Sequence, residues 1–390
     1  MSNRALRVGM VGYAFMGAAH AQGWRNAPRF FDLPIDIELT AVAGRNVDAV
    51  SAAAERFGFA SAETGWQTLE ERDDIDLVDI CTPGDSHAEI AIAALQAGKH
   101  VLCEKPLANS VAEAEEMAAV AAEAATRGRY AMCGFTYRRT PALAYAKSLI
   151  EHSRLGAIRH VRGQYLQDWL HDENAPMTWR LDKSKCGSGA LGDIGAHLID
   201  TTQWLTGQSI EGVSALLETF VTSRPVLGER CGLGGIGSAD APRAEVTVDD
   251  AALFTARFDG GAVGSFEASR FALGRKNALR VEINGTHGSI AFDFEDNNVL
   301  EFFDGLDPLP EQGFRRVLVT EPDHPYVAAW WPAGHGLGYE HAFTHQVVDL
   351  VTAIAEHRQP APSFADALLV QRVMAAVEAS ASCGSVWTAV

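Results

Sequence analysis

The chain has 390 residues, of which 47% are hydrophobic, and this length is enough to bury two separate hydrophobic cores. Its formal net charge of -18 leaves no basic surplus, which argues against nucleic acid and anionic membrane surfaces as partners. The six cysteines include no CxxC pair, so neither a disulfide framework nor a zinc ribbon is indicated, and reduced thiols in the cytoplasm are expected.

The beginning of the chain combines arginines, an apolar run and small residues, as a signal peptide does, but its glycines fit a strand and a tight turn better. Arg7 to Val11 predicts a buried parallel strand, and Gly12 to Gly17 then leads into a helical segment. Such a turn holds a pyrophosphate at the helix N-terminus. Ala14 stands where the middle glycine is usual, so a plain strand-to-helix turn is an open alternative.

Ile37 to Ala43 predicts the second strand, delayed by an insertion from Pro28 to Pro34. An acidic residue after this strand would bind the ribose of NAD, but none is there. The chain instead reads Gly44-Arg45, and an arginine at this point suits the 2′-phosphate of NADP. A surface arginine in a loop is the alternative.

Helical and apolar segments then alternate as in a doubly wound α/β sheet. The expected elements are a helix over Asp48 to Phe57, a strand over Ile75 to Cys81, a helix over His87 to Leu95, a strand over His100 to Cys103, a helix opened by the Ser110/Glu113 capping box, and a strand over Tyr130 to Phe135. Lys105 follows one of these strands at its carboxyl end, where open α/β sheets bind their ligands. A lysine there can hydrogen-bond a substrate oxygen.

The second part of the chain begins with a predicted helix to about Leu155 and a strand over Ile158 to Gln167. Asp168, Trp179 and Arg180 follow, and flat rings mixed with hydrogen-bonding groups suit a sugar or polyol. Tryptophans in the core and charges on the surface are the equal alternative.

Asp193 and His197 lie four residues apart in the segment Gly189 to Asp200. Positions i and i+4 share one face of a helix, and a carboxylate beside an imidazole is a candidate acid/base pair. A helix cap and a packed histidine would explain the same residues.

Further strands are expected over Val246 to Phe258, Ala262 to Phe271, Arg280 to Ile283 and Ser289 to Phe294, as an antiparallel sheet. The glycine-rich segment from Arg224 to Arg243 is predicted to be a loop, and Asp366 to Ser380 a packed helix. His335, His341 and His345 allow a metal site, but the glutamate is misplaced for HExxH, so we expect no metal and consider His335 for the substrate pocket.

Four segments together resemble the Gfo/Idh/MocA oxidoreductase family: Gly12 to Gly17, CTPGDSH from Cys81, GKHVLCEKPLA from Gly98, and GALGDIGAHLID from Gly189. WWPAGHGLGYEH and the insertion at Pro28 to Pro34 are similar to its levoglucosan-type sugar dehydrogenase branch. The departures are Ala14 and Gly84. The resemblance implies a Rossmann domain over residues 1–135 and an α+β domain with a large, mostly antiparallel open sheet over 136–390. It also implies a cis peptide bond before Pro106.

The resemblance also implies an NAD- or NADP-dependent dehydrogenase that moves a hydride to or from a secondary hydroxyl or ketone of a cyclic polyol or sugar, as a homodimer or homotetramer. Non-enzymatic sugar-responsive regulators and glycosidase-like enzymes that use NAD are the alternatives within the family. Its catalytic residues correspond to Lys105, Asp193 and His197. The expected cofactor-binding residues are Gly12, Ala14, Phe15, Met16, Gly17, Gly44, Arg45, Thr82, Pro83, His87, Glu104 and Lys105. The expected substrate-binding residues are Lys105, Tyr137, Asp168, Trp179, Arg180, Asp193, His197 and His335.

Overall fold

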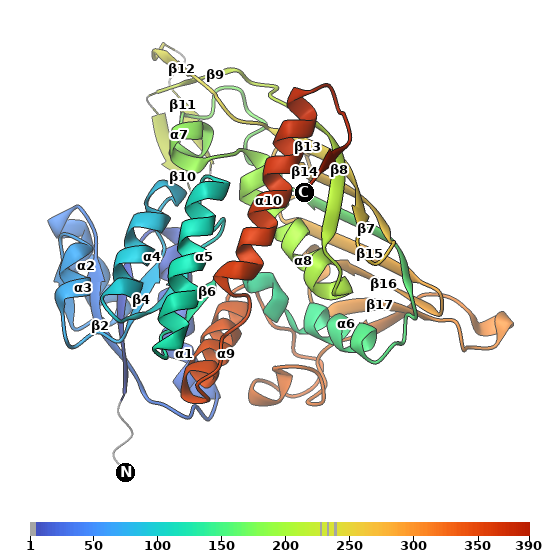
Figure 1. The fold of residues 1–390 in the computed structure, drawn as a ribbon, viewed down its shortest axis with the longest axis horizontal. Helices are drawn as coiled ribbons and strands as arrows, with labels where there is room; N and C mark the ends of the chain where they lie inside the picture. The colour runs from blue at the N-terminus through green and yellow to red at the C-terminus, as the bar shows by residue number, and fades with distance from the viewer. Residues whose placement is uncertain (1–4, 227, 232–233, 238–239) are drawn as a thin grey trace. The chain divides into compact units, whose positions relative to one another are not determined.

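The computed structural model describes residues 5–226, 228–231, 234–237 and 240–390 (Figure 1). The chain forms two compact units: Met1–Arg139 with Gly338–Leu368, and Thr140–Leu337 with Leu369–Val390. The sequence-based division has a single boundary after residue 135. The structure differs because a late segment, Gly338–Leu368, packs with the first unit.

The first unit contains the expected doubly wound parallel sheet. Among its described residues, six strands pair in the order β3-β2-β1-β4-β5-β6, all in parallel. They are β1 (Leu6–Val11), β2 (Ile37–Ala43), β3 (Ser61–Glu63), β4 (Leu77–Ile80), β5 (His100–Cys103) and β6 (Ala131–Cys133). Every residue of β4 and β5 is buried, as is typical of parallel strands covered on both faces.

Helices connect these strands: α1 (Phe15–Phe30), α2 (Val47–Phe57), α3 (Gln67–Glu71), α4 (His87–Gln96) and α5 (Val111–Thr126). The predicted capping box is present, because the Ser110 hydroxyl accepts a hydrogen bond from the Glu113 amide. The insertion expected from Pro28 begins later than predicted, since α1 continues through Pro28 to Phe30. Pro28 has no N–H to donate to the carbonyl of Trp24, so α1 lacks one hydrogen bond in its last turn and ends two residues later.

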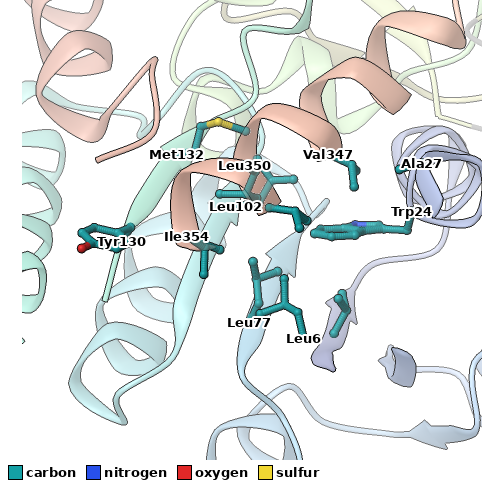
Figure 2. Packing of buried hydrophobic residues seen from close by; sticks show 12 residues of the cluster. Leu6, Trp24, Ala27, Leu77, Leu102, Tyr130, Met132, Val347, Leu350 and Ile354 are labelled. Atoms are coloured by element: carbon teal, nitrogen blue, oxygen red, sulfur yellow. The ribbon is translucent and has the colours of Figure 1, made fainter. Parts of the chain in front are cut away.

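The late segment supplies α9 (His341–Ala355), which completes the core of the first unit. Figure 2 shows Trp24 of α1 and Val347 and Leu350 of α9 meeting Leu77 and Leu102 of the sheet, and these five side chains belong to one buried cluster. Residues as far apart in sequence as Trp24 and Leu350 thus share one core, which is why α9 belongs with this unit.

The second unit is built on a large, mostly antiparallel sheet, as predicted. In the part of this unit that is described, nine strands pair in the order β18-β17-β16-β15-β7-β14-β13-β8-β19, and only β7 and β14 run parallel. They are β7 (Ile158–Leu166), β8 (Ile210–Glu218), β13 (Ala251–Phe258), β14 (Val263–Ser269), β15 (Ala278–Gly285), β16 (Gly288–Asp293), β17 (Val299–Asp304), β18 (Arg315–Leu318) and β19 (Thr388–Ala389).

The helices of this unit are α6 (Pro141–Glu151), α7 (Lys183–Cys186), α8 (Ala196–Thr206) and the part of α10 (Phe364–Ser382) from Leu369 onward. The side chain of Leu198 on α8 packs next to Gly163 of β7, so α8 covers one face of the sheet. A π-helical turn, Leu191–Gly195, runs directly into α8.

The segment from Arg224 to Arg243 is not simply the loop that the sequence predicted. Its described residues include the short strands β10 (Gly228–Cys231) and β11 (Gly234–Gly237), which pair antiparallel, and β9 (Ser223–Pro225) pairs with β12 (Arg243–Glu245). Residues 227, 232–233 and 238–239 lie outside the described part. The prediction failed because glycine and proline weaken strand propensity, yet ladders of three or four residues tolerate them.

The helices also bear on whether the chain could cross a membrane. Over the described ranges, none of the helices has both the length and the apolar character needed to span a bilayer.

Candidate active site

The predicted cofactor-binding turns leave one edge of the parallel sheet. Val11 pairs with Ala43 and with Ile80, and Ile80 pairs with Cys103, so four strands end at the same level. The turns that follow them contain Gly12, Gly44, Thr82 and Glu104. Ligands bind at the carboxyl ends of such strands, and this edge is therefore the candidate dinucleotide site.

The turn after β1 packs tightly against neighbouring backbone, and two of its glycines stand where a side chain would not fit. Gly12 has φ +93°, and a Cβ atom there would lie 2.9 Å from the Cys81 carbonyl oxygen. A Cβ on Gly17 would lie 2.3 Å from the Gly12 oxygen. No side chain caps the N-terminus of α1, where Ala14 is the capping residue. These features fit a pyrophosphate held at the helix N-terminus despite the alanine.

Two residues beside this turn were not assigned a cofactor role by sequence reasoning. The Tyr13 ring occupies the space at Gly44, where a Cβ would lie 2.1 Å from the ring carbon Cε1. Tyr339 stacks on Phe15, with ring centroids 6.1 Å apart and planes 12° apart. Arg45 follows β2 as an exposed side chain, and Met16 is half-buried. No spacing rule identifies an aromatic ring that packs on a glycine of another strand.

His87 ties two of the turns together. Its Nε2 lies 2.9 Å from the Thr82 carbonyl oxygen and its Nδ1 lies 2.9 Å from the Pro106 oxygen. The Ser86 hydroxyl donates to the Thr82 hydroxyl at 2.7 Å, just after Pro83. His87 therefore lies at the expected edge of the sheet and links the turn after β4 to the turn after β5.

Lys105 follows β5, as predicted, and the peptide bond to Pro106 is cis. The Lys105 amide donates to the Glu104 carboxylate at 3.3 Å. Tyr137 lies in a 3₁₀ turn (Thr136–Arg139) soon after β6 and is only 6% exposed. Both residues lie near carboxyl ends of the same parallel sheet, in the first unit.

In the second unit, the segment with Asp193 is held by a carboxylate that sequence reasoning missed. Asp249 accepts hydrogen bonds from the Gly189 amide at 2.7 Å and from the Leu191 amide at 2.8 Å. These bonds satisfy the N–H groups at the start of the π-helical turn. The expected regular helix is thus a π turn joined to α8, and such turns are frequent at functional sites.

Arg270 lies beside Asp193. Its guanidinium is fully buried, lies 3.8 Å from the Asp193 carboxylate, and donates to the Asp249 carbonyl oxygen at 2.9 Å. The same group lies 5.7 Å from the centre of the Trp169 ring. Arg270 thus links the Asp193 carboxylate to the backbone of Asp249.

His197 is 9% exposed on the first turn of α8, and its ring centre lies 6.0 Å from that of Tyr165 on β7. The Tyr165 hydroxyl donates to Asn277 Oδ1 at 2.7 Å, and the Gln167 amide donates to the same oxygen at 2.9 Å. A polar network therefore begins next to the candidate base. Tyr165 is a neighbour of His197 that the sequence did not identify.

The other predicted substrate residues have protein partners in the second unit. Asp168 pairs with Lys276 at 2.7 Å, and this hydrogen bond lowers the pKa of the Asp168 carboxyl. The Arg180 guanidinium stacks 4.4 Å from the Trp179 ring centre. His335 is exposed and contacts the Pro332 oxygen through Nδ1 at 2.8 Å. These contacts give Asp168 and Arg180 structural roles, and their contacts with a substrate stay predictions.

The three predicted catalytic residues divide between the units. Lys105 belongs to the first, and Asp193 and His197 belong to the second. Within its own unit each lies where the resemblance predicts, the lysine after a parallel strand and the acid/base pair at the start of a helix. Their joint action stays a prediction.

Potential metal ligands gather at one place in the described ranges: the buried His20, Asp79 and Cys81. The histidines considered for a metal are engaged differently. His345 Nδ1 lies 2.9 Å from the Arg139 oxygen, and His341 Nδ1 accepts from the Gly338 amide at 3.0 Å.

A groove of about 710 Å³ lies over β7, β14, β15 and β16 of the large sheet. Its lining contains none of the predicted site residues, so we do not regard it as the reaction site.

Comparison with known families agrees with this arrangement. Residues 6–135 match the oxidoreductase family with an NAD-binding Rossmann fold, and residues 143–291 match the GFO/IDH/MocA C-terminal domain. The fold and the turn geometry thus define a nicotinamide-dependent oxidoreductase with an NAD-binding Rossmann domain. The chain belongs to the Gfo/Idh/MocA family, which confirms the resemblance, and the predicted class of sugar or polyol dehydrogenase is confirmed with it.

Individual relatives show which branch of the family the chain resembles. The chain is 42% identical over 383 residues to levoglucosan dehydrogenase of Pseudarthrobacter phenanthrenivorans, covering 97% of this chain and 96% of that protein. It resembles a solved oxidoreductase domain protein from Kribbella flavida with 62% identity and TM-score 0.94, covering 99% of both chains. A levoglucosan dehydrogenase structure in complex with NADH and levoglucosan matches with 40% identity and TM-score 0.92, over 99% of this chain and 100% of that one.

Proposed function

We propose that the protein is an NAD-dependent dehydrogenase of levoglucosan or a closely related cyclic sugar, oxidising one secondary hydroxyl. The observation that carries this proposal is the full-length likeness to levoglucosan dehydrogenase, with 42% identity over 97% of the chain. By the resemblance, Lys105, Asp193 and His197 correspond to the catalytic residues of the family. Inositols and other sugars are the nearest alternatives, since an inositol 2-dehydrogenase is 31% identical over 55% of the chain.

The roles follow from the chemistry of each side chain. Lys105 donates a hydrogen bond to the reacting oxygen and stabilises the negative charge that develops there. His197 accepts the hydroxyl proton as the general base. Asp193, beside the Arg270 guanidinium, orients His197 or a neighbouring substrate hydroxyl.

The residues at the edge of the parallel sheet hold the cofactor. Gly12 permits the tight turn and Gly17 the close packing of α1 on it, the small side chain of Ala14 lets the pyrophosphate approach the backbone, and the N-terminus of α1 stabilises its charge. Bound NAD supplies the acceptor for the hydride, so that the hydroxyl-bearing carbon becomes a carbonyl carbon.

One assay tests the reaction against the two alternatives. Absorbance of reduced nicotinamide is followed with levoglucosan, L-sorbose, glucose and inositols as substrates. We expect net reduction of NAD with levoglucosan or another cyclic sugar of the panel. Binding without turnover would indicate a regulator, and hydrolysis of a glycoside without net reduction would indicate a glycosidase-like enzyme.

The same assay with NADP addresses Arg45. We propose that this exposed residue after β2 gives access to NADP, because the position that carries an acidic side chain in NAD-specific enzymes is basic here. If NADP supports turnover, Arg45→Ala should raise its KM by roughly tenfold and leave the KM for NAD unchanged. An equal change in the KM values for NADP and NAD would show that Arg45 does not bind the 2′-phosphate.

We also propose a cytoplasmic homodimer or homotetramer. Buried cysteines outside any disulfide, Cys81 and Cys103, support a reducing compartment. Exposed apolar side chains such as Leu253 and Val263 on the large sheet support self-association. Light scattering on the purified protein tests the assembly, and a monomer at all concentrations would contradict it.

A further inference from the structure

A fully buried histidine lies behind the Lys105 turn. His20 of α1 is 1% exposed, and its Nδ1 lies 2.9 Å and 3.0 Å from the two carboxylate oxygens of Asp79 on β4. Its Nε2 lies 2.9 Å from Glu104 Oε1 at the end of β5. The ring thus bridges two buried acidic side chains from neighbouring strands. The reaction described above uses none of these three groups directly.

The groups around the two acids show which partner carries the protons. Asp79 receives the Trp24 indole N–H at 2.7 Å and faces the Cys81 thiol at 3.7 Å. Glu104 Oε2 receives the Lys105 amide. Both acids are surrounded by donors, which suits carboxylates that only accept. A neutral imidazole has a single N–H and would turn its lone pair toward one carboxylate, whereas an imidazolium donates to both.

The remaining neighbour of the ring is apolar. Phe343 of α9 packs against it, with ring centroids 5.4 Å apart. Burial opposes a charge on the ring, but the Asp79 carboxylate outweighs it, and the pKa of His20 lies well above its usual value. The contribution of His20 to the free energy of unfolding is therefore fully present below about pH 6.5. It is lost only as the pH rises through the raised pKa of His20.

The Glu104 carboxylate connects the His20 ring to the backbone of Lys105. One oxygen faces His20 and the other accepts the backbone amide of Lys105. Gly134 leaves the space for it, since a Cβ there would lie 2.6 Å from Glu104 Oε1. The position of the Lys105 backbone thus depends on a hydrogen bond from a helix more than 80 residues earlier in the chain.

A metal ion held by His20, Asp79 and Cys81 is the competing explanation. The nitrogen-to-oxygen separations of 2.9 Å and 3.0 Å are hydrogen-bond lengths, and the second ring nitrogen bonds Glu104. Burial raises the pKa of the Cys81 thiol to about 12, so a thiolate ligand is disfavoured.

We propose that His20 is a buried imidazolium clamped between Asp79 and Glu104, and that it acts as a positioning residue for Lys105 through the Glu104 carboxylate. Its influence on turnover rests on the proposed role of Lys105, whereas its charge state does not.

The first experiment measures the charge state in the full-length protein. Histidine labelled with ¹⁵N on the ring gives NMR signals that distinguish one N–H from two, and His20→Gln assigns the His20 signal. We expect two protonated nitrogens for His20 at pH 8. A single protonated nitrogen, or a signal that changes when a chelator is added, would overturn the proposal.

Another buried histidine of the same unit is the internal control. His345 contacts the Arg139 carbonyl oxygen, and burial lowers the pKa of His345 to about 3. It should show one N–H from pH 5 to pH 8. Two buried histidines in opposite charge states would exclude a general effect of burial or of the solvent.

The second experiment measures the influence on Lys105. His20→Gln should lower kcat by roughly tenfold to a hundredfold, because a misplacement of about 1 Å at a reacting group can cost a hundredfold. The dissociation constant for NADH should change less than about twofold, since the glycine turn is untouched. His345→Gln, a matched loss of a buried histidine, should leave kcat within about twofold.

The outcomes separate this proposal from the proposed function. A folded His20→Gln protein with unchanged kcat overturns the positioning role. If Lys105→Ala retains full activity, the function of Lys105 fails while the NMR result still decides the charge state. If His20→Gln does not fold, ¹⁵N labelling of the unaltered protein, with His20 assigned through Asp79→Asn, provides the same decision.

Discussion

The Lys105 turn and the Asp193 turn place their functional side chains by different means. Behind Lys105, one side chain positions another. The His20 ring on α1 contacts Asp79 on β4 and Glu104 directly after β5. Behind Asp193, a carboxylate holds backbone, because Asp249 binds the amides of the π turn. The first arrangement depends on a charge, and the second depends on two acceptor oxygens in the right place. Substitutions that preserve shape should therefore affect the two turns differently.

The largest effect should come from removing the functional groups themselves. Lys105→Ala and His197→Ala should each lower kcat by roughly a hundredfold or more, because stabilisation of the oxygen and general base catalysis are both lost. The control for the lysine is Lys99→Met, since Lys99 lies just before β5 and donates to the Arg72 carbonyl oxygen. That variant should retain kcat within about twofold. Near-normal turnover of a folded His197→Ala protein would remove His197 as the base.

A smaller effect should follow from one atom at the Asp193 turn. Asp249→Asn puts an NH2 group opposite one of the two backbone amides, so one buried hydrogen bond is lost. The free energy of unfolding should therefore fall by roughly 1–3 kcal/mol. Urea denaturation followed by tryptophan fluorescence measures this change. Asp182→Asn is the matched control, because Asp182 caps α7 through a single oxygen and asparagine caps equally well. Equal destabilisation by both substitutions would contradict the role of Asp249.

The smallest effect should distinguish two glycines, one beside each turn. A Cβ on Gly134 meets Glu104 Oε1 at 2.6 Å, whereas a Cβ on Gly192 meets only the Ser188 side chain, at 3.0 Å. Gly134→Ala should cost about 1 kcal/mol of stability and lower kcat several-fold, because the carboxylate must move. Gly192→Ala should change kcat less than about twofold. The reverse order would show that the Asp193 turn is the more tightly packed of the two.

Local signals in the sequence identified most of the first unit. Ile37–Ala43 and His100–Cys103 have the bounds that the sequence predicts, and the last four residues of the first and all four of the second are buried, as parallel strands covered by helices require. The capping box at Ser110 identified the start of α5 for a similarly local reason. In the second unit, β8, β17 and β18 were not identified. The edge strand β18 is mostly exposed and carries two arginines, so it lacks an apolar pattern.

Contacts between distant residues explain the features that sequence reasoning missed. Asp249 and Arg270 meet the Asp193 turn from β13 and β14 regions more than 50 residues later, and nothing in the spacing of an isolated aspartate or arginine indicates a buried partner. α9 joins the first unit because its apolar face completes a core with Trp24 and Leu102. Such pairings depend on which surfaces meet after the chain has folded.

The sequence by itself determined the family, the order of strands and helices in the Rossmann unit, and the identity of the three candidate catalytic residues, because these depend on local patterns and motifs. Only the tertiary structure decided how two of the turns are held: His20 between two carboxylates, and Asp249 on the amides before Asp193. A buried polar group is stable only with a partner, and the chain supplies that partner from another element.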